Sequence, residues 1–557
     1  MKSYYCKDIN NLFINKKIIL NGWIYNKKIL KNIIFINLRD SSGEIQLVCY
    51  KNNINFDKIS KLKCESCIKV CGFVKHKKLL FINKNIYNNF EIEIKYINLL
   101  CDSNSLPIDF NSNLSEYQKL KFRYLYLRNK KPSNLIKIKS EINWYVHKFM
   151  RKNNFLNIET PILSKRFIHE GSKNYIVSSR KYNNKYYSLS QSPQLFKQIL
   201  MISGFDKYYQ IAKCFRDEDL RSDRQPEFTQ IDFEVSFKYE NYIYNITEKL
   251  IKYIFKQILN INIDNKFKKI TFKESINKFG TDKPDLRSLL EIIHINNLLN
   301  VDNLSYMFDI IHIPNGIYIK NINNYIINFN LNNNLFILNF NKFKYFLNYL
   351  NLNINNILYE KIIFYLNKNT ININNDLILI YIIDKNLYSI EIISKIRTYI
   401  GIQLSVEKFS FIWITDFPMF KLNNGNIESM HHPFSSPKKN NINKINKLYI
   451  NKNINSLLSR SYDLVINGYE VASGSVRINN RKTQELIFDL LNISKIDQKK
   501  YFGFFLDALS YGAPPHSGIA IGLDRLTMLI TNINNIKDII AFPKTSSAYD
   551  LLMDFPN

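Results

Sequence analysis

Two charged stretches, about 300 residues apart, carry side chains suited to phosphate chemistry. The first is Cys214-Phe-Arg-Asp-Glu-Asp-Leu-Arg-Ser-Asp-Arg-Gln-Pro-Glu-Phe228, in which strand-like ends flank a charged centre. The second is Gly518-Ile-Ala-Ile-Gly-Leu-Asp-Arg-Leu526, an apolar strand that runs into a helix beginning near Asp524. An arginine presented on a strand can grip a phosphate. Taken singly, each stretch is more simply a solvated hairpin or a surface ion pair, and neither has the glycine pattern of a P-loop or Rossmann site.

Three cysteines form the other cluster of side chains that could carry chemistry. Cys64, Cys67 and Cys71 have C-x2-C-x3-C spacing, but no second Cys/His pair follows at zinc-finger spacing. Seven cysteines in a long chain suit a reducing compartment. We therefore expect structural thiols rather than a metal site.

Composition limits the class of protein. The chain has 557 residues, a formal net charge of +30 and 46% hydrophobic residues. This length predicts about three to four domains, and the apolar content excludes a mostly disordered chain. The charge favours a polyanionic partner such as nucleic acid, although frequent Asn, Ile and Lys, which share A/T-rich codons, explain part of the excess. No apolar run suits a signal peptide or a membrane span, which predicts a soluble cytoplasmic protein without membrane contacts.

The elements that position these residues fall into blocks. Residues 1–105 contain short β-rich runs with an Asp40–Gly43 turn, which predicts a small OB-like barrel. The expected strands are Ile18–Tyr25, Ile33–Arg39, Glu44–Tyr50, Ile68–Lys75, Leu79–Ile82 and Phe90–Ile97. A hinge is expected over 106–132. Helical periodicity then marks Ser133–Lys152 and Tyr242–Leu259.

The texture of the sequence changes from about residue 283 to 405, where Asn, Ile, Phe and Tyr dominate and motifs are few. Its apolar content is too high for a solvated linker, so we expect an inserted domain. The insertion then divides the catalytic core into residues 133–282 and 406–557.

The two charged stretches together resemble motifs 2 and 3 of the class II aminoacyl-tRNA synthetases, and Phe149–Pro161 resembles motif 1. Over essentially the whole chain, the sequence resembles the bacterial-type aspartyl-tRNA synthetases of class IIb. The further matching segments are Glu170–Tyr175, Gln191–Gln198, Trp413–Pro418, His431–Phe434, Tyr462–Arg477 and Tyr511–His516.

The resemblance implies an α+β fold with three parts: an N-terminal OB-fold anticodon-binding barrel, a class II antiparallel-sheet core with helices and a C-terminal extension, and an inserted, GAD-like α/β domain. It implies that aspartate attacks the α-phosphate of ATP to give aspartyl-adenylate, and that the aspartyl group then passes to the 3′ end of tRNA(Asp). Positioning and charge neutralisation suffice for this reaction without a protein nucleophile. The implied partners are L-aspartate, ATP, Mg²⁺, tRNA(Asp) and a second copy of the chain in a homodimer.

By this resemblance, the catalytic residues are Arg216, at the α-phosphate and the reacting carboxylate, and Arg525, at the γ-phosphate end. The other implied ATP contacts are Asp217, Glu218, Gln225, Phe228, Glu470, Gly522, Leu523 and Asp524. Asp463 and Glu470 are the implied Mg²⁺ ligands, since this ion prefers hard oxygen donors.

The selectivity for aspartate can be argued from charge. A desolvated carboxylate needs paired cations, and Lys197 and Arg477 occupy the family's positions for that task. The other implied aspartate contacts are Glu170 in a mobile lid, Ser192, Gln194, Arg216, Asp232, His431 and His432.

In the barrel, Phe35, Gln46 and Glu93 match the family's anticodon contacts, where an aromatic ring can stack on an unpaired base. A core position is the alternative for Phe35. Two segments depart from the family pattern: the Asn26–Asn32 loop lacks its usual Asp or Gly, and Ala472 and Ser473 replace two glycines.

Other functions stay open at this stage. Asparaginyl- and lysyl-tRNA synthetases share the barrel and core, but a neutral amide needs no pair of cations and a lysine ammonium would be repelled by one. The remaining alternatives are a non-discriminating enzyme that also charges tRNA(Asn), and an inactive RNA-binding paralogue.

Overall fold

The computed structural model describes residues 3–77, 89–110, 112–165, 173–295, 306–319, 334–339, 342–343, 375–384, 389–423, 425–438 and 457–556. The expected strand Leu79–Ile82 and the lid residue Glu170 lie outside these ranges. The chain divides into two compact units, Met1–Phe122 and Arg123–Asn557. In the described part of the chain, no helix combines the length and the apolar character needed to cross a membrane.

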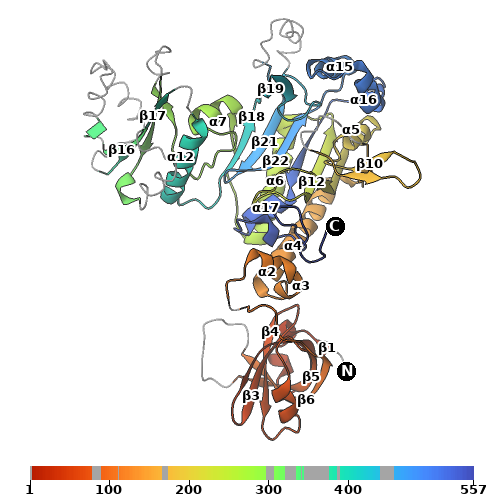
Figure 1. Cartoon of the computed structure of the whole chain (residues 1–557), viewed down its shortest axis with the longest axis vertical. Helices are drawn as coiled ribbons and strands as arrows, with labels where there is room; N and C mark the ends of the chain where they lie inside the picture. Colours follow the sequence, from red (N-terminus) through yellow and green to blue (C-terminus); the bar gives the residue numbers. More distant parts are fainter. Residues whose placement is uncertain are drawn as a thin grey trace. The chain divides into compact units, whose positions relative to one another are not determined.

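The first unit is a closed β-barrel (Figure 1). Its strands are ordered β1-β2-β3-β4-β6-β5, and β2 also pairs with β5 to close the sheet. Alternate residues point inward; on β3 these are Ile34, Ile36 and Leu38, all fully buried. The strands are β1 (Ser3–Tyr4), β2 (Lys17–Ile29), β3 (Ile33–Arg39), β4 (Glu44–Tyr50), β5 (Cys67–His76) and β6 (Phe90–Cys101), with helices η1 (Cys6–Asp8), η2 (Asn11–Phe13), α1 (Phe56–Lys61) and α2 (Glu116–Lys121).

The barrel confirms the predicted OB-fold with one local correction. Strands β3 and β4 have the predicted bounds, and Asp40 closes the predicted turn by accepting hydrogen bonds from Ser42 and Gly43. The segment Asn26–Asn32, however, is not all loop: β2 continues to Ile29 after a bulge beyond Ile24, because residues up to 29 still find partners on β3.

The cysteine cluster Cys64, Cys67 and Cys71 lies in the first unit, near the start of β5. Across the described ranges, no three His, Cys, Asp or Glu side chains are grouped so that they could hold a metal ion. Cys64, Cys67 and Cys71 form no disulfide.

The second unit is built on an eight-stranded sheet, ordered β13-β18-β21-β22-β23-β12-β11-β7 (Figure 1). Neighbours are antiparallel except for β13–β18 and β11–β7. This sheet confirms the predicted class II core. The strands are β7 (Leu156–Asn157), β11 (Lys207–Phe215), β12 (Glu227–Ser236), β13 (Lys268–Thr271), β18 (Phe411–Thr415), β21 (Ser461–Ile466), β22 (Tyr469–Val476) and β23 (His516–Gly522).

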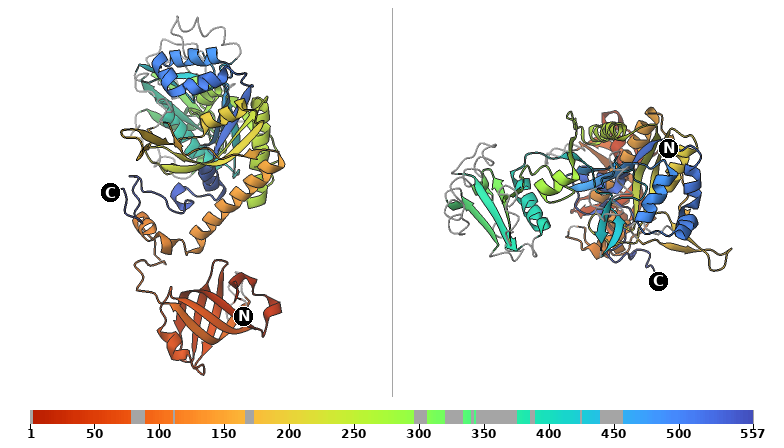
Figure 2. Two further views of the ribbon diagram at one scale, coloured as in Figure 1. Left: turned by 90° about the vertical axis from the view of Figure 1, so that its right-hand side faces the viewer. Right: turned by 90° about the horizontal axis from the view of Figure 1, so that it is seen from above.

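The long helices α4 (Lys130–Lys152) and α6 (Glu240–Leu259) pack together on one face of this sheet (Figure 2). They begin slightly earlier than predicted. Apolar residues at helical spacing, such as Ile142, Val146 and Met150, meet Ile231 and Phe233 of β12 in one core. The other described helices of the unit are α3 (Arg123–Tyr126), α5 (Gln194–Ile202), α7 (Phe272–Phe279), α12 (Ile390–Leu404), α15 (Arg481–Leu490), α16 (Lys495–Leu509), α17 (Leu523–Ile530), η3 (Gly316–Tyr318) and η5 (Ile536–Asp538).

The inserted segment leaves the core after α7 and rejoins it at β18. Its described part is a four-stranded sheet, β14-β15-β17-β16, covered by α12, with its own apolar core. The strands are β14 (Ile293–His294), β15 (Tyr306–Ile313), β16 (Leu335–Asn339) and β17 (Leu377–Asp384). Two small sheets complete the unit: β8 (Leu163–Ser164), β9 (Ile176–Ser178) and β10 (Tyr186–Leu189) form one, and β19 (Phe420–Asn423) and β20 (Asn426–Ser429) the other.

Candidate active site

Strand alternation turns one face of the large sheet into a polar site. On β12, Ile231, Phe233 and Val235 point into the core beneath α4 and α6. Asp232 and Glu234 therefore point to the opposite face, and both are fully buried. The same alternation on β21 places Asp463 between two core residues.

A cavity of about 420 Å³ lies on this polar face. It brings together most of the residues implied by the resemblance, although they come from segments more than 300 residues apart. Those lining it are Ser192, Gln194, Lys197, Arg216, Glu218, Gln225, Phe228, His431, His432, Asp463, Glu470, Arg477, Gly522, Asp524 and Arg525.

Among the implied ATP and aspartate contacts that the structure describes, three do not line the cavity. Asp217 is exposed, and its backbone bridges to Lys173. The Leu523 side chain is buried in the sheet–helix core. Asp232 is fully buried and contacts Lys197.

One end of the cavity combines a cation with an aromatic ring. The Arg216 guanidinium lies 5.0 Å from the centroid of the Phe228 ring. Gln225 is held by the backbone of Lys544, whose N–H donates to Oε1 at 2.8 Å and whose carbonyl accepts from Nε2 at 3.2 Å. Glu218 pairs with Arg224 at 3.0 Å. This end offers a flat apolar surface beside fixed polar groups, as a nucleobase requires.

The start of α17 is braced from several sides. The Asp524 carboxylate accepts a hydrogen bond from the Thr229 backbone N–H at 2.8 Å and pairs with Lys139 of α4. The next residue, Arg525, pairs with Asp223 at 3.1 Å and donates to the Glu470 carbonyl. The Asp524 carboxylate is thus engaged by other groups of the protein. These contacts fix the start of α17, from which the Arg525 side chain extends.

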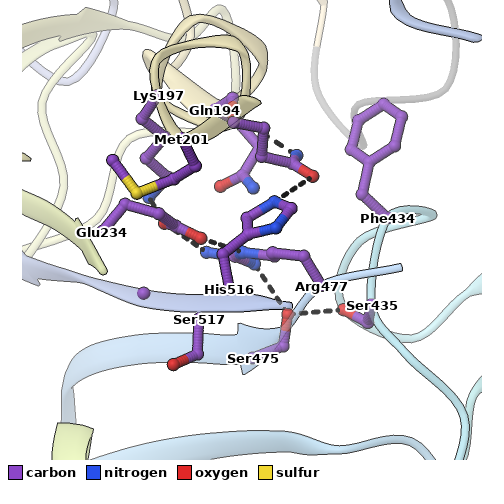
Figure 3. Close-up of polar contacts among 12 residues, drawn as sticks. Gln194, Lys197, Met201, Glu234, Phe434, Ser435, Ser475, Arg477, His516 and Ser517 are labelled. Atoms are coloured by element: carbon purple, nitrogen blue, oxygen red, sulfur yellow. Dashed lines mark hydrogen bonds and ion pairs between the residues drawn. The ribbon is translucent and has the colours of Figure 1, made fainter. Parts of the chain in front are cut away.

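Two buried cations on the cavity wall, Lys197 and Arg477, both contact the buried carboxylate of Glu234 (Figure 3). Lys197 Nζ lies 2.5 Å from Asp232 Oδ1 and 3.2 Å from Glu234 Oε2. Arg477 contacts Glu234 through Nε at 2.8 Å and donates through NH1 to Ser475 Oγ at 2.6 Å. The four charges balance, which offsets the cost of burying them.

The pKa values of the two carboxylates that contact Lys197 are shifted in opposite directions. Burial raises the pKa of Asp232 above its ordinary value, in spite of Lys197. Burial also acts to raise the pKa of Glu234, but Arg477 and Lys197 outweigh it and hold that pKa below its ordinary value. Glu234 is therefore the firm anion between the two cations.

Gly518 leaves room for this arrangement. It lies opposite Glu234 on the neighbouring strand. A Cβ atom at Gly518 would lie 1.8 Å from Glu234 Oε2 and 2.5 Å from the Phe233 carbonyl oxygen. Any side chain here would displace the carboxylate that the two cations share.

Two adjacent histidines on the cavity wall have opposite character. His431 Nε2 lies 3.1 Å from both Asp463 oxygens. Burial acts to lower the pKa of His431, but Asp463 outweighs it and raises that pKa. Burial, with Arg477 and Lys197 nearby, holds the pKa of His432 well below its ordinary value, so His432 is neutral.

Asp463 and Glu470 are carboxylates on neighbouring strands that both line the cavity. Burial raises the pKa of Asp463. Burial acts in the same direction on Glu470, but Lys283 and Arg525 hold its pKa below the ordinary value. Two hard oxygen donors facing a cavity suit a divalent cation that takes its other ligands from a phosphate and water.

The two residues that replace family glycines fit their positions. Ala472 and Ser473 lie within β22, and neither has the positive φ that favours glycine. Ala472 is buried and Ser473 lines the cavity.

Glu234 and Lys283 were missed by the sequence reasoning. The alternation Ile231-Asp-Phe-Glu-Val235 carries a signal for Glu234, because it places two acids on the face opposite the core. No spacing or motif signals Lys283, which lies at the first residue assigned to the inserted domain.

The barrel residues Phe35, Gln46 and Glu93 lie on its outer face. Phe35 alternates with buried Ile34 and Ile36 and is itself half-buried, so it is not a core residue. It pairs with Val48, which in turn pairs with Glu93, so Phe35 and Glu93 lie in one row across β3, β4 and β6, and Gln46 lies two residues from Val48 on β4.

Comparison with known proteins gives a consistent set of relatives. Residues 115–546 match the family described as tRNA synthetases class II (D, K and N), and residues 18–100 match the OB-fold nucleic acid binding domain. The chain is 44% identical to the aspartate–tRNA ligase of Buchnera aphidicola subsp. Schizaphis graminum, over all of this chain and 97% of that protein. It is 42% identical to the enzyme of the same name from Buchnera aphidicola subsp. Baizongia pistaciae, over all of this chain and 99% of that one.

Solved structures with the same fold include asparaginyl-tRNA synthetases. That of Pyrococcus horikoshii, complexed with asparaginyl-adenylate, has a TM-score of 0.62 at 20% identity and covers 98% of each chain. That of Entamoeba histolytica, also with asparaginyl-adenylate, has a TM-score of 0.61 at 17% identity, over 98% of this chain and 99% of that one. At this identity, the likeness concerns the fold alone.

Proposed function

Since the chain belongs to the class II tRNA synthetases for aspartate, lysine and asparagine, we infer that it is an aspartate–tRNA ligase. The observation that carries this inference is the pair of buried cations, Lys197 and Arg477, on the wall of the cavity. They can form ion pairs with an anionic side chain, whereas a neutral amide gains no ion pair from them and a lysine ammonium is repelled. The alternatives of a non-discriminating enzyme and an inactive paralogue are not favoured, since the full-length relatives are aspartate–tRNA ligases.

The reaction then follows from the placement of charges. Arg216 holds the α-phosphate and the attacking aspartate carboxylate, and Arg525 holds the γ-phosphate end. These cations neutralise charge as the carboxylate oxygen attacks phosphorus and pyrophosphate leaves. In the structure, the Asp232 carboxylate pairs with Lys197. When aspartate binds, Asp232 pairs instead with the ammonium group of the substrate. Lys197 is then released to bind the side-chain carboxylate of the substrate.

The full set of proposed contacts is that implied by the resemblance, extended by Glu234. Asp463 and Glu470 would hold Mg²⁺, and the ion would supply further neutralisation of the ATP phosphates. We propose that the enzyme acts in the cytoplasm on tRNA(Asp).

Aspartate-dependent exchange between ATP and pyrophosphate tests the function directly. The purified chain should incorporate labelled pyrophosphate into ATP with aspartate and far more weakly with asparagine or lysine. A chain that shows no aspartate-dependent exchange would not be this enzyme.

The barrel should select tRNA without affecting amino-acid activation. Phe35→Ala should weaken charging of cognate tRNA by about 1–3 kcal/mol, the value of one stacked base, and should leave pyrophosphate exchange unchanged. Parallel aminoacylation and exchange assays measure both steps. Equal losses in the two assays would contradict this division of labour.

We propose that the enzyme is a homodimer that pairs through the motif 1 region. Large apolar side chains are exposed there, including Trp144 at 64%, Leu156 at 53% and Leu163 at 50%, and a symmetric partner would cover them. Light scattering at micromolar concentration should give about 132 kDa, twice the 66.1 kDa of one chain. A species of one-chain mass at that concentration would rule the dimer out.

A further inference from the structure

The segment that connects the core to the inserted sheet places a lysine side chain in the active-site cavity. Residues 280–290 (the strap) join α7 to β14, and Lys283 on the strap lines the cavity. Its Nζ lies 2.9 Å from Glu470 Oε2, and its side chain is 37% exposed. In contrast to Lys197, which is 1% exposed, Lys283 is thus open to a ligand in the cavity.

The strap is fixed on both sides of Lys283. Before it, the Thr281 carbonyl accepts from Ser275 Oγ of α7 at 2.6 Å. After it, Pro284 restricts the Lys283 backbone, and Asp285 is 3% exposed and packs beneath the turn at Gly468, where a Cβ atom would lie 3.3 Å from Asp285 Cβ.

The inserted sheet secures the far end of the strap. Arg397 of α12 is fully buried and donates to the backbone carbonyls of Ser288 at 3.2 Å and Leu290 at 2.8 Å. Lys283 is therefore positioned before a ligand binds, because the strap backbone is held at Thr281, Asp285 and Ser288. This preorganisation lowers the conformational-entropy cost of a contact between Lys283 and the ligand.

Glu470 lies between two cations. Lys283 contacts its carboxylate, and Arg525 donates to its backbone carbonyl. Arg525 is the proposed ligand of the γ-phosphate end, so Lys283 lies on the same side of the cavity. An ammonium has three N–H donors, and Glu470 accepts one of them.

We propose that Lys283 is a further ATP-binding residue, which contacts the β- and γ-phosphates while Glu470 holds it in place. The proposal rests on the proposed function. It means that the root of the inserted domain completes the polyphosphate site, whereas the alternative is that Lys283 only balances the charge of Glu470.

Titration calorimetry with ATP and with AMP, at one fixed Mg²⁺ concentration, separates the two possibilities because AMP lacks the β- and γ-phosphates. In Lys283→Met, ATP should bind about tenfold to a hundredfold more weakly, the range of a hydrogen bond to a charged group, while AMP binding stays unchanged. Lys283→Arg should recover part of the ATP affinity.

Lys278→Met is the matched control. Lys278 makes a similar ion pair, 3.2 Å from Glu291, but both side chains are about half exposed and lie outside the cavity. Its ATP affinity should equal that of the wild type. Unchanged ATP affinity in folded Lys283→Met, or an equal loss for AMP, would overturn the proposal. Wild-type protein that fails to bind ATP would instead contradict the proposed function.

Discussion

Replacing Lys197 by Met is expected to lower kcat/KM for aspartate by about 2–5 kcal/mol, or roughly 30-fold to several thousand-fold. Lys197 is 1% exposed and contacts both Asp232 and Glu234. Without its charge, the substrate carboxylate would face two buried acids with Arg477 as its remaining partner. The KM for ATP should change far less. Steady-state exchange with aspartate and with asparagine measures both the loss and the change of preference.

The contact with Asp232 allows a competing explanation, in which Lys197 serves stability alone. On that view, a folded Lys197→Met enzyme keeps the wild-type preference for aspartate over asparagine. This result would contradict the assignment of Lys197 as a ligand of the substrate's side-chain carboxylate. Lys197→Arg retains the charge and guards against a variant that does not fold. Lys213→Met, which removes an exposed lysine 3.3 Å from Glu227, is the control.

The second large effect concerns Glu234. Glu234→Gln should reduce the free energy of unfolding around β12 and β23 by about 3–5 kcal/mol at neutral pH, the cost of breaking a buried ion pair. Because the pKa of Glu234 is held below its ordinary value of 4.5, its contribution is complete above that pH. The difference between wild type and variant should therefore stay constant from pH 7 to pH 5 and shrink as the pH falls further.

Amide hydrogen exchange on peptides from β12 and β23 suits this measurement, since a chain with two units need not unfold in one step. Glu65→Gln is the matched control: Glu65 is a buried acid that contacts Arg39 at 2.7 Å within the barrel. It should speed exchange in the barrel and leave β12 unaffected. Equal protection of β12 in wild type and Glu234→Gln would refute the assigned role of this charge.

Much of the fold was readable from periodicity. The β3 and β4 bounds were predicted because both runs are rich in β-forming residues and the Asp40–Gly43 turn separates them. The long helices were predicted from their apolar stripes, but their first turns were missed. At α4, these residues are Lys130, Lys131 and Pro132, which contribute no apolar periodicity ahead of Leu135.

The site was harder to derive. Neither Arg216 nor Arg525 alone predicts an active site. Both could be assigned to one site only because the sequences around them resemble two motifs of the same family. Glu234 was overlooked because the family motif drew attention to Asp232, although strand alternation gives both acids the same face. Lys283 could not be found, because its approach to Glu470 depends on a tertiary contact between the strap and the turn at Gly468.

The root of the inserted segment also bears on how this chain can be remodelled. Ser288, on the strap by which the segment leaves the core, lies against Gly401 near the end of α12, by which it returns. The two junctions are therefore neighbours, and a short artificial linker could replace what lies between them without stretching the parent sheet. A truncation designed in this way should preserve the strap through Ser288, because a shorter graft would discard Lys283 together with the appendage.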